Sequence, residues 1–160
     1  MLKLITKMIK VNVLSEEKSW TKKINKKEYF FNQLCKFFPK KFRFINKKIY
    51  ITLLLSNNKN IKKLNKKFRN KNKNTDILSF PFEQNTKSLK EIYLGDIIIS
   101  FDHINKPQSI NKYDFKYKLV KIFIHGFLHL IGYDHKKYKE YKKMLKEEEK
   151  IFKSVQKFIN

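Results

Sequence analysis

The 160-residue chain is poor in cysteine, glycine and acidic residues. Its single cysteine, Cys35, cannot form an internal disulfide, which is usual for proteins of a reducing compartment, so we expect a cytoplasmic protein. No apolar run reaches the length of about 18 residues that a membrane-spanning helix needs. Residues 1–14 alternate lysine with apolar residues and lack a small-residue cleavage site, which predicts a strand there and no signal peptide.

The shortage of acids leaves a large excess of positive charge. The chain has 38 lysines and arginines against 14 acidic residues, a formal net charge of +24. Such an excess attracts polyanions, with RNA as the expected partner and neither DNA nor a membrane. However, the lysines are spread along the chain, and lysine, asparagine, isoleucine and phenylalanine dominate throughout, as in proteins of AT-rich genomes. The charge therefore permits RNA binding without establishing it.

Histidine and glycine are scarce, yet they gather in one short segment. Of 4 histidines and 3 glycines in the chain, three histidines and two glycines lie within His125–His135. His125 and His129 are four residues apart, so on a helix they share one face, about 6 Å apart along the axis. Gly132 follows where a helix commonly ends in a left-handed turn, and that turn can fold His135 back. Three neutral imidazoles of this kind predict an open tetrahedral metal site.

This spacing matches the metzincin proteases with one substitution. Gly126 stands where those enzymes have the glutamate that acts as general base, so the usual proton shuttle for peptide hydrolysis is missing. A single histidine in an apolar helix is usually a core residue, but burying two uncompensated imidazoles costs a few kcal/mol, which a metal removes. Glycine within a helix also costs about 1 kcal/mol relative to alanine, so we expect close approach of substrate or backbone at Gly126.

Hydrophobic periodicity predicts the order of the elements. The predicted strands are residues 8–14, 48–55, 77–82 and 91–100, and the predicted helices are residues 28–38, 58–70, 114–131 and 136–158, with loop or short helix at 101–111. Pro81 places the third strand at a sheet edge or at its own end. The inner face of the last helix is predicted to comprise Tyr138, Tyr141, Met144 and Ile151. This order favours one α+β domain over residues 1–160, a small mixed sheet packed against helices.

Arg69 closes the second predicted helix and is one of two arginines in the chain. Its planar guanidinium suits a phosphate, although a cation at the C-terminal end of a helix is also favoured by the helix dipole.

Taken together, three segments resemble the YbeY family of bacterial endoribonucleases, the rRNA maturation factors. They are Leu64–Pro81, Leu94–Ile97 and His125–His135, with Met144 and Glu148 where the family has a methionine and a glutamate.

The resemblance covers most of the chain from Ile51 onward and carries specific expectations. It implies one zinc ion (Zn²⁺) per chain, bound by His125, His129 and His135, and a functional arginine at Arg69. It also implies single-strand-specific RNA cleavage, maturation of the 16S rRNA 3′ end and quality control on the ribosome. The expected partners are therefore rRNA and the small ribosomal subunit.

The chain departs from the family at two places. Asn74 stands where proline is usual, and Lys121–Ile122 replaces a more usual Thr-His. Because no glutamate follows His125, we expect the metal to activate a water or polarise a phosphodiester oxygen directly, with Arg69 binding the phosphate.

Three further polar residues near these segments carry weaker expectations. Asp134 could orient an imidazole or the metal-bound water, or cap the next helix. Asp96 is expected to be structural, at a turn or strand end near the site. His103 lies outside the spacing and is given no role.

Two other functions stay open from the sequence. The protein could be a non-nucleolytic ribosome-associated RNA-binding factor with a structural zinc, which predicts that His129→Ala unfolds it. It could also be a zinc hydrolase of another class, although Gly126 argues against a peptidase. The spacing alone supports only a zinc hydrolase, and the resemblance favours the ribonuclease.

Overall fold

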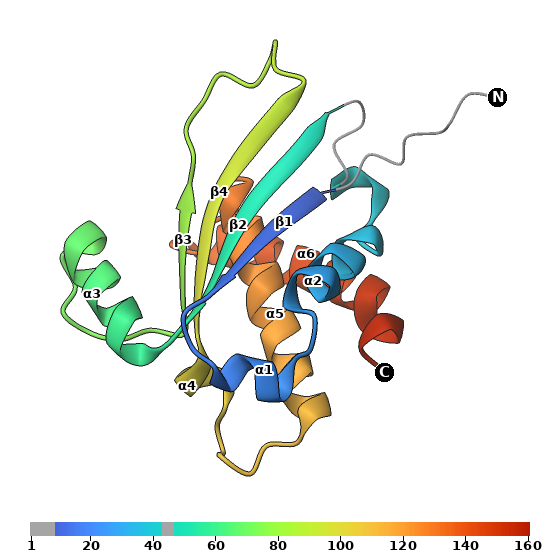
Figure 1. Ribbon diagram of the computed structural model, residues 1–160. Helices are drawn as coiled ribbons and strands as arrows, with labels where there is room; N and C mark the ends of the chain where they lie inside the picture. Colours follow the sequence, from blue (N-terminus) through green and yellow to red (C-terminus); the bar gives the residue numbers. More distant parts are fainter. Residues whose placement is uncertain (1–8, 43–46) are drawn as a thin grey trace.

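The computed structural model describes residues 9–42 and 47–160, and its centre is a four-stranded sheet (Figure 1). The strands are β1 (Ile9–Ser15), β2 (Lys48–Ser56), β3 (Ile77–Pro81) and β4 (Glu91–Ser100), in the order β1-β2-β4-β3. β1, β2 and β4 are parallel, and β3 pairs with β4 antiparallel. The predicted mixed sheet is therefore confirmed, and Pro81 ends an edge strand as expected. The part of the N-terminal prediction that falls on residues 1–8 lies outside the described residues.

Helices surround this sheet. They are α1 (Ser19–Lys23), α2 (Lys27–Lys36), α3 (Asn58–Arg69), α4 (Phe101–Ile104), α5 (Lys112–Leu130) and α6 (Tyr138–Ile159), with a 3₁₀ turn at Lys40–Phe42. The α+β architecture follows the sequence prediction. α1 and the 3₁₀ turn were not predicted, because elements this short show no hydrophobic period. None of the helices in the described ranges is long and apolar enough to cross a bilayer.

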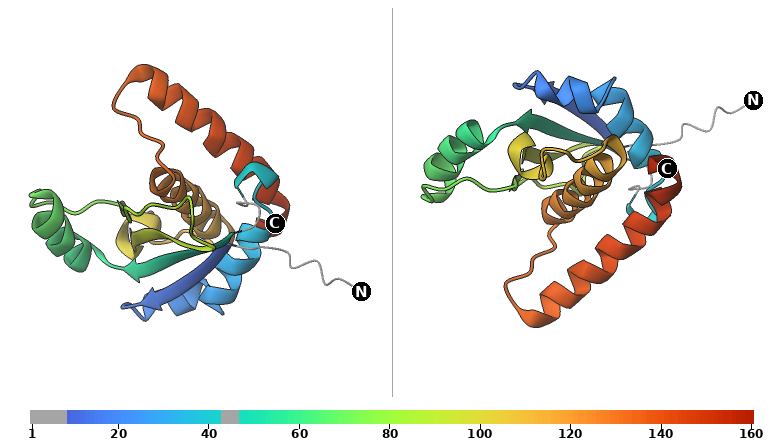
Figure 2. Two further views of the ribbon diagram at one scale, coloured as in Figure 1. Left: turned by 90° about the horizontal axis from the view of Figure 1, so that it is seen from above. Right: turned by 90° about the horizontal axis from the view of Figure 1, so that it is seen from below.

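The main core lies between one face of the sheet and α5 (Figures 1 and 2). Alternate residues of β2 point into it, because successive side chains of a strand face opposite sides. From α5, Phe115, Phe123 and Phe127 are fully buried against this face. Each buried side chain of this size contributes about 2 kcal/mol. This packing fixes α5 firmly along the sheet.

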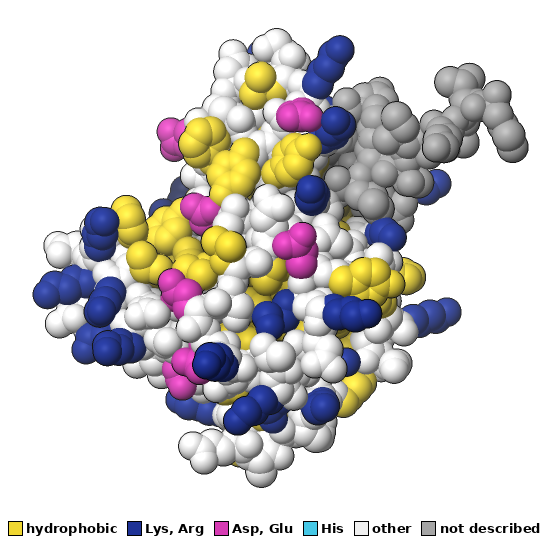
Figure 3. Space-filling view, in the orientation of Figure 1, with side chains coloured by type: hydrophobic (Ala, Val, Ile, Leu, Met, Phe, Trp, Pro, Cys, Tyr) yellow, Lys and Arg dark blue, Asp and Glu magenta, His cyan; other side chains and the backbone are white. Residues whose placement is uncertain are grey.

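The other face of the sheet is only partly covered, by α3. Ile61 of α3, Leu78 of β3 and Ile98 of β4 form a small separate cluster there. Figure 3 shows an apolar patch on this face beside α3, with lysines around it. α3 and α5 therefore lie on opposite faces of the sheet.

β4 contains an irregularity that explains Gly95. The pairing of β2 with β4 skips Leu94, and Gly95 follows at φ +136°. A Cβ on Gly95 would lie 2.1 Å from the carbonyl oxygen of Phe80, so only glycine fits. Asp96 comes next, within the strand, where it contacts the hydroxyl of Tyr93. The prediction of a turn or strand end for Asp96 is therefore wrong, because the bulge lets β4 continue through this position.

The predicted inner face of α6 is half right. Met144 and Ile151 are buried as expected, but Tyr138 and Tyr141 are 70% and 49% exposed. In Figure 2 the first turns of α6 stand away from α5. The helix therefore begins its contact with the core only near Met144, which periodicity could not reveal.

Candidate metal centre

The three histidines are positioned by the C-terminal end of α5 and the turn after it. At the other end of α5, the side chain of Asn111 accepts a hydrogen bond of 2.8 Å from the amide of Asp114. The helix ends at Leu130, and Gly132 adopts φ +97°, the predicted left-handed turn. This turn carries His135 back toward the helix.

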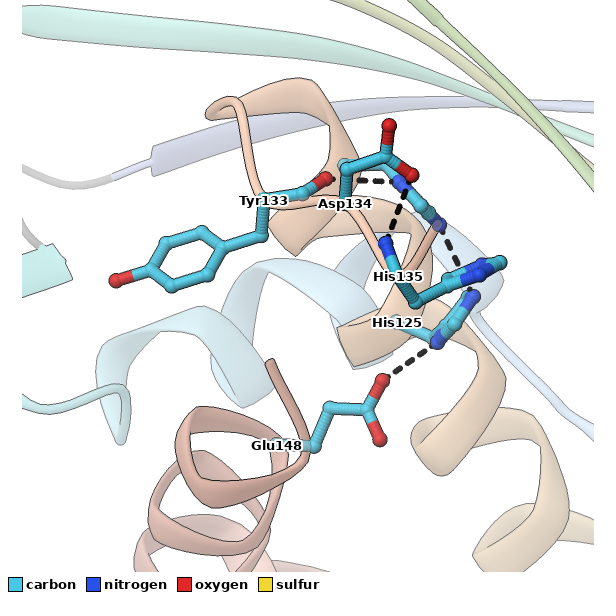
Figure 4. Close-up of polar contacts among 6 residues, drawn as sticks. His125, Tyr133, Asp134, His135 and Glu148 are labelled. Atoms are coloured by element: carbon cyan, nitrogen blue, oxygen red, sulfur yellow. Dashed lines mark hydrogen bonds and ion pairs between the residues drawn. The ribbon is translucent and has the colours of Figure 1, made fainter. Parts of the chain in front are cut away.

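The histidine cluster is confirmed in the geometry (Figure 4). The potential ligand atoms of His125, His129 and His135 all lie within 4.8 Å of one another. The Nε2 atoms of His125 and His129 are 3.1 Å apart. Two imidazole nitrogens bound to one tetrahedral zinc at about 2.05 Å would lie about 3.3 Å apart. The spacing of this pair therefore fits a metal ion of that size, and His135 lies close enough to complete the donor set.

Hydrogen bonds at the opposite ring nitrogens determine which atom of each histidine is free. The Nδ1 atom of His129 lies 2.9 Å from the carbonyl oxygen of Tyr133, which can only accept, so Nδ1 carries the proton. The Nδ1 atom of His125 likewise donates to Oε1 of Glu148, at 2.5 Å. Both Nε2 atoms of the neutral rings then carry lone pairs that face each other. In this tautomer the pair shares no proton, and a cation placed between the two nitrogens would bind both lone pairs.

Glu148 is a site residue for which the sequence analysis predicted no role. It belongs to α6, 23 residues beyond His125. Its side chain is half-buried and connects α6 to the histidine cluster. Spacing within the histidine segment could not find it, and its one signal was its place in the family resemblance. A carboxylate that accepts from the far nitrogen of a metal-binding histidine orients the ring and raises its basicity.

The electrostatics of the cluster favour a neutral imidazole at His129. Burial lowers the pKa of His129, and positive charge on His125 or His135 would lower it further. A neutral ring is the form that binds a metal.

Asp134 supports the turn through the backbone. Its Oδ1 accepts a 2.7 Å hydrogen bond from the amide of His135, and this bond lowers the pKa of the Asp134 carboxyl. The N-cap of α6 is Lys137, whose amide donates to Glu140 at 3.0 Å. The capping alternative for Asp134 is therefore wrong, because the N-cap lies three residues later. Asp134 instead helps to hold His135 in place.

The cluster faces an open groove between α5 and α6. The groove has a volume of about 310 Å³ and is lined by His125, His135, Tyr141, Met144, Leu145 and Glu148. A ligand can therefore reach the histidines from solvent. Tyr141, wrongly predicted to be buried, forms part of this wall.

Gly126 is explained by packing against the sheet. A Cβ at this position would lie 2.6 Å from Cδ1 of Ile77, 3.1 Å from Oγ of Ser79 and 3.2 Å from Cγ2 of Ile97. Close approach at Gly126 is confirmed, but the expectation of substrate or backbone as its partner is wrong, because side chains of β3 and β4 make the contact. Because Gly126 faces the sheet, a glutamate there would not point toward the groove.

Arg69 is not brought into this groove. It is exposed at the C-terminal end of α3, and within the described residues it has no hydrogen bond or ion pair. His103 also lies outside the cluster, with Nε2 3.2 Å from Oδ1 of Asn74. Asp96 lines a different groove, with Leu64 and Phe68 of α3. The structure thus unites the three histidines and Glu148, and leaves Arg69 on the other side of the edge strand.

The fold and the site define an α+β protein with an open three-histidine cluster of the kind that can hold a metal ion. Comparison with known proteins narrows this class. The family model described as "Endoribonuclease YbeY" matches residues 12–156. A protein named Endoribonuclease YbeY from Pelagibacter ubique is 62% identical over 92% of this chain and 97% of its own length. A protein of the same name from Wolbachia is 33% identical over 95% of this chain and 93% of its own length.

The chain belongs to the YbeY family. The solution structure of TM1509 from Thermotoga maritima supports the fold, with a TM-score of 0.50 at 22% identity and 92% of both chains covered. The family resemblance seen in the histidine segment is therefore confirmed.

Proposed function

We propose that this protein is a zinc-dependent endoribonuclease that cleaves single-stranded RNA and acts in maturation of the 16S rRNA 3′ end and in ribosome quality control. The observation that carries the proposal is the pair of facing Nε2 atoms of His125 and His129, beside His135 in an open groove. The names of the relatives supply the reaction, cleavage within RNA. The net charge of +24 suits a polyanionic substrate.

His125, His129 and His135 would hold the metal, and the hydrogen bonds at Nδ1 of His125 and of His129 leave the Nε2 atoms of those two rings free to bind it. A bound Zn²⁺ supplies Lewis acidity and lowers the pKa of a bound water. Glu148 keeps the proton of His125 on Nδ1, and the carbonyl of Tyr133 does the same for His129. No carboxylate follows His125 in the sequence, so the peptidase proton shuttle is not available.

The first test is cleavage of an rRNA fragment with a single-stranded 3′ extension. We expect cutting by the zinc-loaded protein, and its loss in His129→Ala and after chelation. His103→Ala is a matched control, because His103 lies outside the cluster and should leave cutting unchanged. A His129→Ala protein that unfolds would favour a structural zinc, and circular dichroism distinguishes this from a folded, inactive protein. Unaltered cutting by folded His129→Ala would contradict the proposal.

Arg69 is proposed to bind the RNA phosphate through its planar guanidinium. Since it lies at the end of α3, on the opposite face of the sheet from α5, the RNA would have to pass around the edge strand β3. Arg69→Lys should therefore lower the cleavage rate by at least tenfold and leave the zinc content at one per chain. Equal loss of zinc and of cutting would contradict this division of roles.

A further inference from the structure

A second groove continues from the metal groove along the contact between α5 and α6. It has a volume of about 560 Å³ and shares Leu145 and Glu148 with the wall of the metal groove. Beyond that shared end, its walls carry Tyr117 and Lys121 from α5 and Phe152 from α6. A ligand lying in the metal groove can therefore extend into this one without leaving the surface.

Two aromatic rings form the centre of this second groove. Tyr117 and Phe152 are half-buried, with ring centroids 4.8 Å apart at an interplanar angle of 73°. The Nζ atom of Lys121 lies 5.0 Å from the Tyr117 centroid and 5.4 Å from that of Phe152. The rings thus present electron-rich faces that already attract a cation, and faces of this kind also stack on nucleobases.

The charges along the groove favour a base over a phosphate as its occupant. The walls carry Lys121 and Lys153, but also Glu148 and Glu149, so the charges of the lining cancel. A phosphate gains little in such a groove, whereas an uncharged base can stack on the rings. Lys121 is exposed, so its ammonium can leave the rings and contact a phosphate at the rim of the groove when a base stacks in its place.

On the basis of the proposed ribonuclease activity, we propose that this groove binds one unpaired nucleobase of the RNA next to the metal centre. Because the two rings are nearly perpendicular, at 73°, the base stacks on the face of one ring and contacts the edge of the other, and Lys121 contacts the phosphate of the same nucleotide. Lys121 and His125 are four residues apart on α5, about 6 Å along the helix, which is within reach of adjacent nucleotides. A paired base is held in its duplex and cannot enter, so the groove selects single strands.

Binding to metal-free protein tests this proposal separately from cleavage. The probe is a fluorescently labelled single-stranded RNA of eight nucleotides, measured by anisotropy against Phe152→Leu and Tyr117→Leu, which keep apolar bulk but remove the ring. Each variant should raise Kd for the single strand by about tenfold. The control is Tyr29→Leu, since Tyr29 is 63% exposed on α2 and should leave Kd unchanged. Lys121→Gln should reduce the slope of log Kd against log salt by about 0.7, the value for one phosphate contact.

Two results would overturn the base site. One is a Kd that neither aromatic variant changes, and the other is an equal loss of affinity for single-stranded and duplex RNA. Because no metal is present, the outcome does not depend on whether the protein cuts RNA. Unchanged binding by a protein that cuts would remove the base site and leave the enzyme. Tenfold weaker binding in a protein that does not cut would support the base site and remove the enzyme.

Discussion

At the scale of single residues, the metal centre depends on which ring nitrogen each histidine leaves free. The carbonyl of Tyr133 and the carboxylate of Glu148 each hold a proton on Nδ1 of one histidine. The two Nε2 atoms then face each other at 3.1 Å, and a cation between them would bind both lone pairs. The clustering of the three histidines was predictable from spacing within eleven residues, whereas these orienting partners come from the backbone and from another helix.

The role of Glu148 predicts a loss of metal affinity when its carboxylate is removed. Glu148→Ala should raise the zinc Kd by about 10- to 100-fold, because His125 loses the partner that fixes its proton and its orientation. Competition with a chromogenic chelator measures this Kd. Glu149→Ala is the matched control, since its neighbouring carboxylate is exposed and is not part of the histidine cluster. An unchanged Kd in Glu148→Ala would mean that the contact does not support the metal.

At Gly126, packing against the sheet predicts the opposite effect on stability from the one that helix propensity predicts for alanine. Alanine in a helix is favoured over glycine by about 1 kcal/mol, but its Cβ would lie 2.6 Å from the Ile77 side chain and crowd β3 and β4. Overpacking of this kind costs about 1–3 kcal/mol, so Gly126→Ala should lower the free energy of unfolding by about 1 kcal/mol. Urea unfolding measures it. A more stable variant would show that the sheet yields easily at this position.

At the scale of elements, one ion pair fastens α6 to the segment before β2. Nζ of Lys41, in the 3₁₀ turn, lies 2.5 Å from Oε2 of Glu147, whose side chain is only 8% exposed. Burial alone would raise the pKa of Glu147, but the hydrogen bond and charge of Lys41 hold it below its ordinary value of 4.5. α6 carries Glu148 in the next position, so this pair helps to position the metal groove.

Removing the Lys41 ammonium from Glu147 should therefore destabilise the fold in a pH-dependent way. Lys41→Met should lower the free energy of unfolding by about 1 kcal/mol at pH 7, a modest value because Lys41 is half exposed. A carboxyl with a lowered folded-state pKa stabilises above its ordinary value of 4.5 and loses this contribution as pH falls through the folded pKa. The difference from wild type should thus shrink as the pH falls below 4.5.

The control is Lys48→Met, because the Lys48–Glu91 pair joins side chains that are 65% and 59% exposed. That variant should match wild type closely at pH 7 in urea unfolding. A Lys41→Met protein as stable as Lys48→Met would show that the buried carboxylate does not need its partner.

The long helices were predictable from the sequence, but the contacts that they and the strands make with neighbouring elements were not. The 3.6-residue period located α3, α5 and α6 because each buries one stripe over many turns. The same period placed Tyr138 and Tyr141 in the core, because it cannot tell where a helix leaves its neighbour. The bulge at Gly95 depends on a carbonyl from β3, a contact between segments that no local pattern contains.

At the scale of the whole molecule, the sheet separates two kinds of surface. The histidine groove lies between α5 and α6, while Arg69 ends the helix on the opposite face of the sheet. An RNA that uses both must be long and flexible enough to pass the edge strand, which suits a single strand better than a stiff duplex. This arrangement could not be predicted, since it requires knowing which face each helix covers.

The metal-free molecule should lose stability in mild acid. Burial lowers the pKa of His129 below its ordinary value of 6.5 in the folded state. As pH falls below about 6.5, the unfolded chain takes up a proton that the folded chain refuses, so the free energy of unfolding falls. Urea unfolding of chelated protein at pH 7.5 and 5.5 measures this, and His129→Asn should reduce the difference. Greater stability of the chelated wild type at pH 5.5 would contradict the assignment.

The most direct measurement is a zinc titration of chelator-stripped protein with RNA cleavage as the readout. The account predicts no cutting without metal, a rate that rises with each addition, and a break at one zinc per chain. The folded His129→Ala protein should stay inactive throughout the titration. Cutting by the stripped protein, or full activity of His129→Ala, would contradict a reaction that depends on the three-histidine centre.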